Sequence, residues 1–460
     1  MRGPGRWTTT SLRRRLDETL FQDPPPPDPA AQGAPRLLLI GALFLAAVLL
    51  QMLRIGWSIS LHSLWAEDGP VYFSGAVHSG VGGSLFDTYA TYLVFIPRLI
   101  GEIGGLVPLA DAPAAISIAS GVVVALSGWI VWEATAGLLE SPWLRGALAL
   151  LTVLAPVGGL ESIVSGAYVP WFMLFATFWI LLWRPRTALV AAGAGLFALL
   201  TGLSTPGVWF FIPVAILRTI AIRDRRDGLV LAGYWAGAMV QIPVLAFNKE
   251  EAVTPLWSHD ILTTYLQRVV DGAFLGLKLG GKVWEHAGWA ALLILIAVLI
   301  VGLVVGVTRA NLTARLFALL AIPISAVMFI VSVYQRALGE QMIWHAHTWS
   351  EGGGRYAIVP ALLLFSVAAV MVDKRSRRRP GESRPPWLAW GLALLAVVVV
   401  ASSFHVEDPE VRGAPPWQAS LDHSAEVCAS EPPEAETGVA TSPPGWGLNI
   451  PCDELGQFGK

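Results

Sequence analysis

Residues 37–53 read LLLIGALFLAAVLLQML, an apolar run without a single charge, and residues 65–70, WAEDGP, follow a short way behind it. A bilayer core of about 30 Å needs about 20 apolar residues of helix, so this run predicts a membrane span. No small-residue cleavage motif follows the run, which favours a retained helix over a signal peptide. The adjacent carboxylates Glu67 and Asp68 then lie at a membrane face, and such a pair indicates a site.

The composition of the whole chain points the same way. Of its 460 residues, 54% are hydrophobic and 14% are charged, which is too few charges to cover an ordinary soluble surface. The sequence therefore predicts an all-α polytopic membrane protein surrounded by membrane lipids, and gives no indication of a nucleic-acid partner. Apolar runs bounded by charge predict about eleven transmembrane helices. Their ranges are 37–57, 113–138, 143–158, 168–183, 187–202, 206–221, 228–247, 287–307, 314–334, 356–372 and 386–404.

The basic residues predict the orientation of these spans. Lys and Arg collect in cytoplasmic loops, whereas Asp and Glu have little influence. With eleven spans, all the basic clusters fall on one side. They are Arg13–Arg15 with Arg36, Arg145, Arg184 with Arg186, Arg223–Arg226, Arg309 with Arg315, and Lys374–Arg379. We therefore expect a multi-pass plasma-membrane protein with a cytoplasmic N-terminus and an extracytoplasmic C-terminus.

The apolar stretch Tyr89–Leu109 could be a further span or an interfacial segment. An added span would reverse the side of every loop after it, and this decides the assignment. Counting it as a span would move arginine clusters or the 65–70 motif to the wrong side. Pro97, Arg98 and Glu102 within it also favour the interface over the bilayer centre. The domain of residues 37–404 then carries long outer loops at 58–111, 248–286 and 335–355. Interfacial helices are expected in the 58–111 loop and in the 248–286 loop. In the latter, Ile261–Leu279 has amphipathic spacing.

The two ends of the chain lie outside the predicted bundle. Residues 1–36 are rich in Pro and Arg and hold little apolar material, so we expect a disordered cytoplasmic tail. Residues 405–460 contain the only two cysteines, Cys428 and Cys452. Outside the cytoplasm these thiols are oxidised, and a disulfide between them would stabilise the segment by roughly 3 kcal/mol. We expect a small, loop-rich, disulfide-closed cap with little regular structure.

This layout resembles the GT-C superfamily of membrane glycosyltransferases, which take sugars from polyprenyl-phosphate carriers. In that family one or two acidic residues follow the first transmembrane helix, interfacial helices come next, and the second span comes afterwards. Glu67 and Asp68 followed by Tyr89–Leu109 match this order. The resemblance covers residues 37 to about 404, by layout more than by identity. It departs from the family pattern in that the two acids are adjacent and the outer tail is small.

The resemblance implies cationic residues in later outer loops near the donor phosphate. Arg336, Arg355, Lys278 and Lys282 are similarly placed, and Arg98 is a further candidate in the first loop. Arg355 follows a glycine run, whose backbone amides can approach an anion that a guanidinium attracts. Lys278 and Lys282 share one helical face, which could hold a lipid headgroup as readily as a substrate.

The chemistry itself needs a base and a positive clamp. An acceptor hydroxyl loses a proton as it attacks the anomeric carbon, and a carboxylate is a suitable general base. The leaving phosphate needs only fixed positive charge. Asp68 is the first choice for the base, because Gly69 and Pro70 would turn it away from the helix axis. Glu67 could instead hold Mg²⁺ or Mn²⁺, with Asp68 as a further ligand, although no cofactor is certain; both acids could also simply be solvated.

Flat aromatic rings and polar side chains in the outer loops are candidate contacts for the sugar or the acceptor. They are Glu161, Trp344, Trp349, His345 and Tyr92. Glu161 could equally cap a helix, and most tryptophans are expected in the interfacial belts.

The sequence thus predicts an inverting glycosyltransferase, a hexosyl- or pentosyltransferase, that moves a sugar from a polyprenyl-phosphate donor to a cell-envelope glycan or lipid on the outer membrane face. Two alternatives stay open: a polytopic transporter or lipid flippase, and a non-catalytic envelope assembly protein. Against a transporter, only Glu133 lies clearly within a span and the chain shows no internal repeat.

Overall fold

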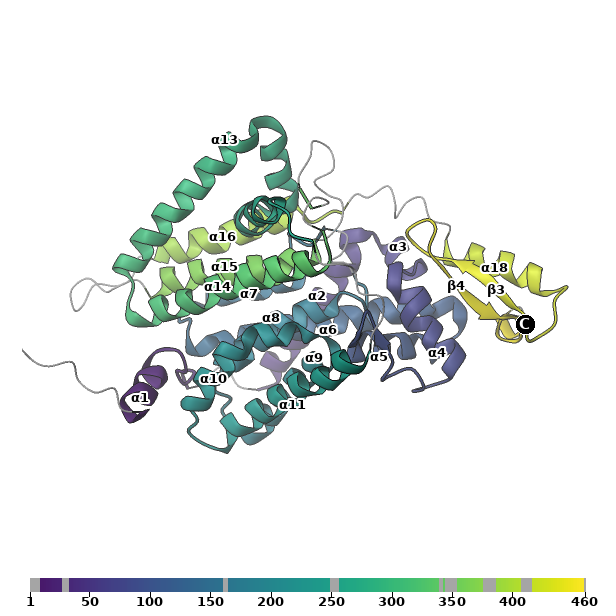
Figure 1. The fold of residues 1–460 in the computed structure, drawn as a ribbon, viewed down its shortest axis with the longest axis horizontal. Helices are drawn as coiled ribbons and strands as arrows, with labels where there is room; N and C mark the ends of the chain where they lie inside the picture. Colours follow the sequence, from purple (N-terminus) through teal and green to yellow (C-terminus); the bar gives the residue numbers. More distant parts are fainter. Residues whose placement is uncertain are drawn as a thin grey trace, which may run out of the picture.

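The computed structural model describes residues 9–26, 33–159, 164–248, 256–338, 342–343, 354–374, 386–406 and 416–458. Helices dominate these residues, and two short antiparallel hairpins complete them. Most helices form a bundle, with the first helix of the described chain at one end and a small cap at the other (Figure 1).

Each of the eleven predicted ranges contains a helix in the expected order. They are α2 (Ala34–Ile55), α6 (Ala112–Ala134), α7 (Pro142–Leu154), α8 (Val169–Leu182), α9 (Ala188–Ser204), α10 (Ile212–Ile220, preceded by η7, Pro206–Phe211), α11 (Arg225–Phe247), α13 (Gly272–Arg309), α14 (Leu312–Gln335), α15 (Arg355–Asp373) and α16 (Pro386–Ser402). Several of them begin with proline in the first turn, where its missing N–H costs nothing.

Six helical segments of the described chain are long and apolar enough to cross a membrane. They run over Ala34–Ile55, Leu109–Gly137, Arg225–Phe247, Asp260–Thr308, Leu312–Gln335 and Arg355–Asp373, and five further apolar helices are shorter. The chain is therefore a helical membrane protein, while eleven crossings remain a prediction.

Helix α8 is the centre of the bundle. All of its residues from Val169 to Leu182 are buried except Trp171, which is partly buried, as expected for a helix that is apolar on all sides. Helices α6, α9 and α15 surround it. Beside it, α9 and α11 approach closely through small residues: a Cβ on Gly202 would lie 2.6 Å from the Gly237 carbonyl carbon.

The first outer loop folds into short helices: α3 (Trp57–His62), η2 (Ala66–Asp68), η3 (Gly69–Phe73), α4 (Ser74–Ser79) and α5 (Phe95–Gly105), with the hairpin β1 (Thr88–Tyr89) and β2 (Tyr92–Leu93) before α5. Helix α5 has 11 residues and rises only about 16 Å, half of what a crossing needs. The short helix η4 (Leu109–Asp111) then leads into α6.

The 248–286 loop differs from the expected separate interfacial helix. Helix α12 (Asp260–Thr264) and η8 (Tyr265–Asp271) run directly into α13, which bends at Gly276 (φ 69°) and Gly288 (φ 51°). Both values lie in the left-handed region that glycine adopts without strain. The second bend falls at the start of the span that the sequence predicts.

The N-terminal segment also departs from the expected disorder, because residues 9–26 are folded. Helix α1 (Thr9–Thr19) and the residues after it bury Leu16, Leu20 and Phe21. Asp17 pairs with Arg184 at 2.5 Å and with Arg223 at 3.2 Å. Residues 1–8 and 27–32 lie outside the described chain.

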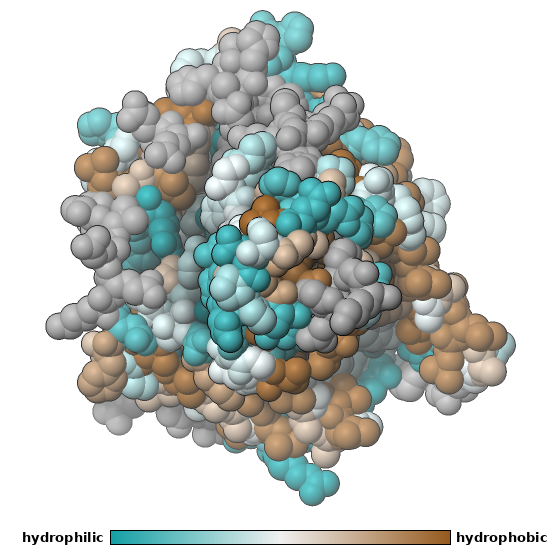
Figure 2. Space-filling model, turned by 90° about the vertical axis from the view of Figure 1, so that its right-hand side faces the viewer, coloured by the Kyte–Doolittle hydropathy of each residue, from teal (hydrophilic) through white to brown (hydrophobic). Residues whose placement is uncertain are grey.

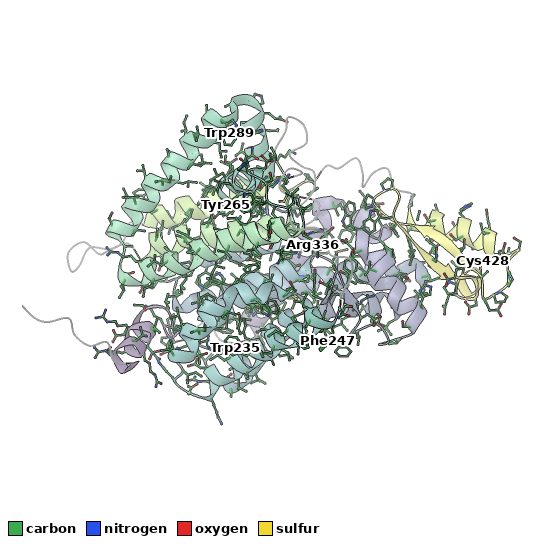
Figure 3. All side chains as sticks on the ribbon, viewed as in Figure 1. Trp235, Phe247, Tyr265, Trp289, Arg336 and Cys428 are labelled. Carbon is green, nitrogen blue, oxygen red and sulfur yellow. A yellow bond between two sulfur atoms is a disulfide. The ribbon has the colours of Figure 1, made fainter. Side chains whose placement is uncertain are left out.

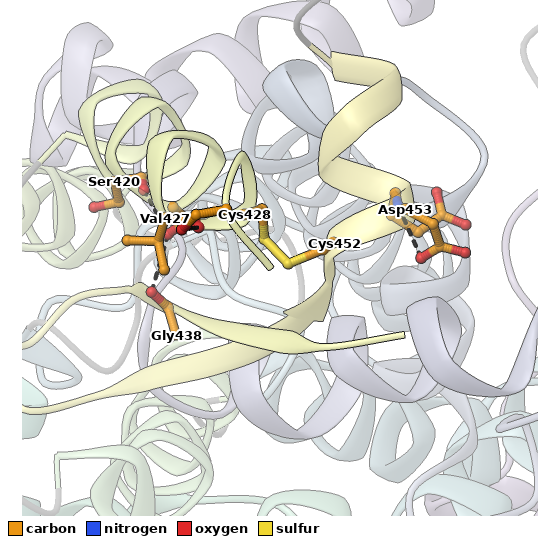
Figure 4. Close-up of a disulfide and its surroundings, with 9 residues drawn as sticks. Ser420, Val427, Cys428, Gly438, Cys452 and Asp453 are labelled. Carbon is orange, nitrogen blue, oxygen red and sulfur yellow. Dashed lines mark hydrogen bonds between the residues drawn. A yellow bond between two sulfur atoms is a disulfide. The ribbon is translucent and has the colours of Figure 1, made fainter. Parts of the chain in front are cut away.

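The C-terminal cap is more regular than the sequence suggests. Helix α18 (Trp417–Cys428) packs on the hairpin β3 (Glu436–Ala440) and β4 (Gly447–Pro451), and α19 (Cys452–Phe458) follows. The predicted disulfide between Cys428 and Cys452 is confirmed (Figure 4). The Ser424 hydroxyl of α18 donates to the Gly438 carbonyl of β3 at 3.0 Å. Viewed from this end, hydrophilic residues gather over the cap and hydrophobic residues over the sides of the bundle (Figure 2).

Candidate functional site

The acidic turn lies where the first outer loop meets the cap. The Leu64 carbonyl accepts from the Ser442 N–H at 2.9 Å, and the Ser442 carbonyl accepts from the Ala66 N–H at 2.5 Å. These two bonds pair the backbone on both sides of Trp65 with the cap. Because Glu67 and Asp68 follow directly in η2, the cap fixes the backbone that carries the two acids.

Asp68 is buried, with 2% of its surface exposed. Its Oδ1 accepts a hydrogen bond from the Ala167 N–H at 3.0 Å. Burial raises the pKa of this carboxyl to about 7, and the neighbouring charge of Glu67 adds to the rise, while the Ser165 side chain and the Ala167 N–H oppose it. A carboxyl that titrates near neutral pH is well matched to accept a proton.

Glu67 is only partly buried, yet one of its oxygens is enclosed. Within the described chain, Glu67 Oε2 has less than 1 Å² of exposed surface and no hydrogen-bond partner. A buried carboxylate oxygen without a donor is costly. It is therefore a place where a ligand hydroxyl or a cation would be stabilised.

Three tyrosines from the first outer loop surround the acids. Tyr72 and Tyr89 meet edge to face with ring centroids 6.1 Å apart, and Tyr89 pairs with Tyr92 across the β1–β2 hairpin. Burial raises the pKa of Tyr72 well above its ordinary value, and the charges of Glu67 and Asp68 contribute. These phenols therefore remain protonated at neutral pH and can serve as hydrogen-bond donors.

Arg355 approaches the same group from the start of α15. Its guanidinium lies over the ring of Tyr168 at 5.4 Å and over the ring of Tyr356 at 5.2 Å. Tyr168 in turn accepts a hydrogen bond from the Trp65 indole at 3.1 Å, through its hydroxyl. Arg355 is therefore connected through Tyr168 with Trp65, two residues before Glu67 and nearly 300 residues away in the sequence.

Arg336 belongs to the same electrostatic environment. It directly follows α14, at the end of that helix toward the cap (Figure 3). Burial raises the pKa of Tyr92, against the opposing charges of Arg336 and Arg355, while Glu67 adds to the rise. The same two arginines and Glu67 act on Tyr89. We call the set of Glu67, Asp68, Tyr72, Tyr89, Tyr92, Tyr168, Arg336 and Arg355 the acid–arginine cluster.

Arg98, a predicted phosphate ligand, has another use in the structure. Its guanidinium donates to the carbonyl oxygens of Val71 and Thr88 and lies 5.6 Å from the centre of the Tyr72 ring. It therefore holds the backbone of η3 and β1 in place around the cluster, and its predicted role as a phosphate ligand stays a prediction.

Lys278 and Lys282 lie on α13 between its two bends, with Lys282 exposed and Lys278 partly buried. In the part of the chain that the structure describes, no hydrogen bond or ion pair connects either lysine with the cluster. Their predicted role in phosphate binding stays a prediction. Glu161, Trp344, His345 and Trp349 lie outside the described residues.

A metal site is a further question for the two acids. Over the described ranges, no group of three or more His, Cys, Asp or Glu side chains is arranged to hold a metal ion. Glu67 and Asp68 supply two carboxylates, so a Mg²⁺ or Mn²⁺ ion here would take its remaining ligands from water or substrate.

Sequence reasoning missed Tyr72, Tyr168 and the Trp65–Tyr168 bond. Tyr168 stands at the entrance of an apolar helix, where an interfacial belt residue is the ordinary reading. One signal was available: the chain has only eight tyrosines, and five of them, including Tyr356, gather here.

Comparison with known proteins finds no matching family and no matching curated protein. Among solved structures, the chain is similar to the oligosaccharyltransferase of Archaeoglobus fulgidus. A crystal structure with zinc and sulfate is 14% identical, with a TM-score of 0.35 over 85% of this chain and 55% of that one. A structure of the oligosaccharyltransferase AglB from the same organism, with an inhibitory peptide and a dolichol-phosphate, is 12% identical, with a TM-score of 0.34 over 86% of this chain and 58% of that one. The chain thus spans little more than half the length of the proteins it matches.

Proposed function

We propose that the protein is a GT-C-like inverting glycosyltransferase that moves a sugar from a polyprenyl-phosphate donor to a cell-envelope glycan or lipid on the outer membrane face. The observation that carries the proposal is the acid–arginine cluster. In it, Asp68 has a pKa of about 7, and Glu67 Oε2 has no hydrogen-bond partner within the described chain. Arg336 and Arg355 act on the tyrosines around the same turn.

In the proposed reaction, the acceptor hydroxyl attacks the anomeric carbon of the donor sugar. Asp68 takes the hydroxyl proton as the new C–O bond forms and the bond to the phosphate oxygen breaks on the opposite side. Arg336 and Arg355 stabilise the negative charge of the leaving polyprenyl phosphate, which needs no proton. Attack from the opposite side inverts the configuration at the anomeric carbon.

Glu67 is the second carboxyl in this scheme. Its enclosed Oε2 would accept a hydrogen bond from a substrate hydroxyl or bind a divalent cation, and so orient the acceptor beside Asp68. The tyrosines would donate to sugar oxygens or to the phosphate, because their phenols remain protonated.

The test is sugar transfer by the purified protein in lipid vesicles, with a panel of polyprenyl-phosphate pentoses and hexoses as donors and an envelope lipid extract as acceptor. Asp68→Asn should reduce the rate by about 10²- to 10⁴-fold, the usual contribution of a general base. Arg355→Gln and Arg336→Gln should reduce it by about 10²-fold each. The matched control Asp422→Asn removes an exposed carboxylate from the cap and should retain full activity.

The outcomes separate the candidates. If Asp68→Asn and Glu67→Gln both retain full activity, the catalytic assignment is wrong. If only Glu67→Gln abolishes transfer, Glu67 is the base. Donor translocation across the vesicle membrane without transfer would instead establish the flippase, and neither activity would favour the assembly protein.

A further inference from the structure

A large groove lies at the opposite end of α2 from the acidic turn. It is lined by α2, α6 and α7 together with Pro24–Pro26 and the residues between α8 and α9, and its volume is about 940 Å³. Helix α2 has 22 residues and rises about 33 Å, and Asp68 follows its C-terminal end. The groove therefore begins about one membrane thickness away from the acid–arginine cluster.

The long wall of the groove is apolar. Helix α2 contributes Leu39, Leu43 and Phe44, and α7 contributes Leu150 and Val153 from the facing side. Leu39 and Leu43 are 60% and 58% exposed, although the helix belongs to the membrane-spanning part of the chain. Surfaces of this kind are covered by hydrocarbon chains in a bilayer.

The short end of the groove is basic. Arg36, Arg145 and Arg186 line it from three separate elements, and Glu133 is the only acid in the lining. Arg36 lies 3.9 Å from Glu133, and Arg145 lies over the Trp132 ring at 4.3 Å while donating to its carbonyl. Arg186 donates to the Pro25 carbonyl. Three guanidiniums against one carboxylate leave an excess of positive charge.

We propose that this groove binds one anionic phospholipid of the bilayer leaflet opposite the acid–arginine cluster. The headgroup phosphate lies among Arg36, Arg145 and Arg186, whose guanidinium planes suit phosphate oxygens. An acyl chain lies along the apolar face of α2. Basic pockets between membrane helices bind anionic headgroups in this manner.

The apolar wall and the basic end together favour an anionic phospholipid over other ligands. A neutral phospholipid would leave the excess positive charge uncompensated at the groove end. A free phosphate ion would bind the arginines but gain nothing from the apolar wall. Only a ligand with an anionic head and a hydrocarbon tail satisfies both.

Native mass spectrometry of the purified full-length protein tests this. After detergent delipidation, the protein is titrated with phosphatidylglycerol, with phosphatidylcholine of the same chains, and with soluble glycerol phosphate. We expect one phosphatidylglycerol to bind at least tenfold more tightly than phosphatidylcholine, and glycerol phosphate to bind undetectably.

Two kinds of variant locate the bound lipid. Arg36→Gln with Arg186→Gln should weaken phosphatidylglycerol binding about tenfold, and Ala46→Phe should do so by filling the groove at an exposed lining position. The matched controls are Arg14→Gln on the exposed face of α1 and Leu45→Phe, an exposed neighbour outside the lining. Both controls should bind as the unmodified protein does.

Ala46→Phe keeps every charge and every buried contact, so it remains informative if the arginine variant fails to fold. Equal binding of the two phospholipids, unchanged binding by Ala46→Phe, or equal binding of glycerol phosphate would each overturn the proposal. Sugar transfer is not measured in this experiment, so its result is independent of the proposed enzymatic function.

Discussion

At the scale of single residues, the defining feature is a carboxyl placed where ionisation is costly. Asp68 is 2% exposed, and the Ser165 side chain and the Ala167 N–H only partly offset the loss of water. The charge of Glu67 beside it adds to the cost. A protein tolerates such a residue when the proton affinity is useful, and proton transfer is the most direct use.

The pH dependence of transfer follows from this pKa. A general base works in its ionised form, so the rate should fall about tenfold per pH unit below pH 7 and reach a plateau above it. Initial rates between pH 5 and pH 9 at saturating donor measure this. A profile that is flat across pH 7 would exclude Asp68 as the base.

Stability should depend on pH in the opposite sense. The folded pKa of about 7 lies above the ordinary 3.8, so the folded protein holds the proton between these values and the unfolded chain does not. The Asp68 contribution to the unfolding free energy is fully present below pH 3.8. It is lost as the pH rises through 7, by roughly 4 kcal/mol in total.

Asp68→Asn keeps the oxygen that accepts from Ala167 and removes the charge, so the variant should be more stable than the unmodified protein at pH 8 and similar at pH 4. Thermal unfolding in detergent at both pH values provides the comparison. Equal melting temperatures at pH 8 would mean that the buried carboxyl costs nothing when ionised.

Gly166 sets the space around the same carboxyl. A Cβ here would lie 3.2 Å from Asp68 Oδ1 and 3.2 Å from Ile100 Cγ2, so Gly166→Ala should displace the carboxyl by a few tenths of an ångström. We expect transfer to slow by up to about tenfold, since small misplacements of reacting groups are costly. The matched control is Gly193→Ala, where a Cβ contacts nothing, and it should leave the rate unchanged.

At the scale of elements, the cap acts on the acidic turn through its backbone. The loop between β3 and β4 carries Ser442, which bonds to Leu64 and Ala66. Trp417 of α18 donates to the Leu109 carbonyl at 2.7 Å and meets Phe73 edge to face at 6.2 Å. The cap is thus attached on both sides of η3.

The disulfide should therefore influence a site that it does not touch. Cys428 and Cys452 are 24 residues apart, and opening this loop costs roughly 3 kcal/mol in the chain-entropy model. Cys428→Ser with Cys452→Ser should accelerate hydrogen exchange at residues 64–68 and lower transfer severalfold. Exchange in α8, far inside the bundle, is the internal reference and should not change. Unaltered exchange at 64–68 would show that the cap does not brace the turn.

The helices that the sequence predicted correctly are those with a long apolar run, whose hydropathy alone indicates a helix. All eleven helical ranges follow from hydropathy, because the bilayer leaves few alternatives to helix. The cap and α1 were not predictable in this way, because their stability comes from contacts with distant residues. Asp17 is held by Arg184 and Arg223, and Ser442 by the strand-like backbone at 64–66. Such pairings leave no local pattern in a polar, Pro-rich sequence.

At the scale of the whole molecule, the two ends of the bundle carry different chemistry. Near α1, buried arginines pair with acids: Arg218 bonds to Asp227 at 2.9 Å, and Arg184 to Asp17. At the other end lies the cap (Figure 1), whose Ser442 bonds to the backbone just before the acids of the acid–arginine cluster. The sequence could predict that the acids and arginines share a side, but it could not predict that Tyr168 and Trp65 connect Arg355 with the acidic turn.

This difference between the ends predicts the orientation, because arginine-rich segments resist translocation. Both native cysteines are in the disulfide, so a single added cysteine reports its own exposure. Asp422→Cys, exposed on α18, should react with a membrane-impermeant maleimide on intact cells. Arg14→Cys, on the exposed face of α1, should react only after the membrane is opened. The reverse labelling pattern would place the acid–arginine cluster on the cytoplasmic side, where a nucleotide-activated sugar, rather than a lipid-linked one, would be the available donor.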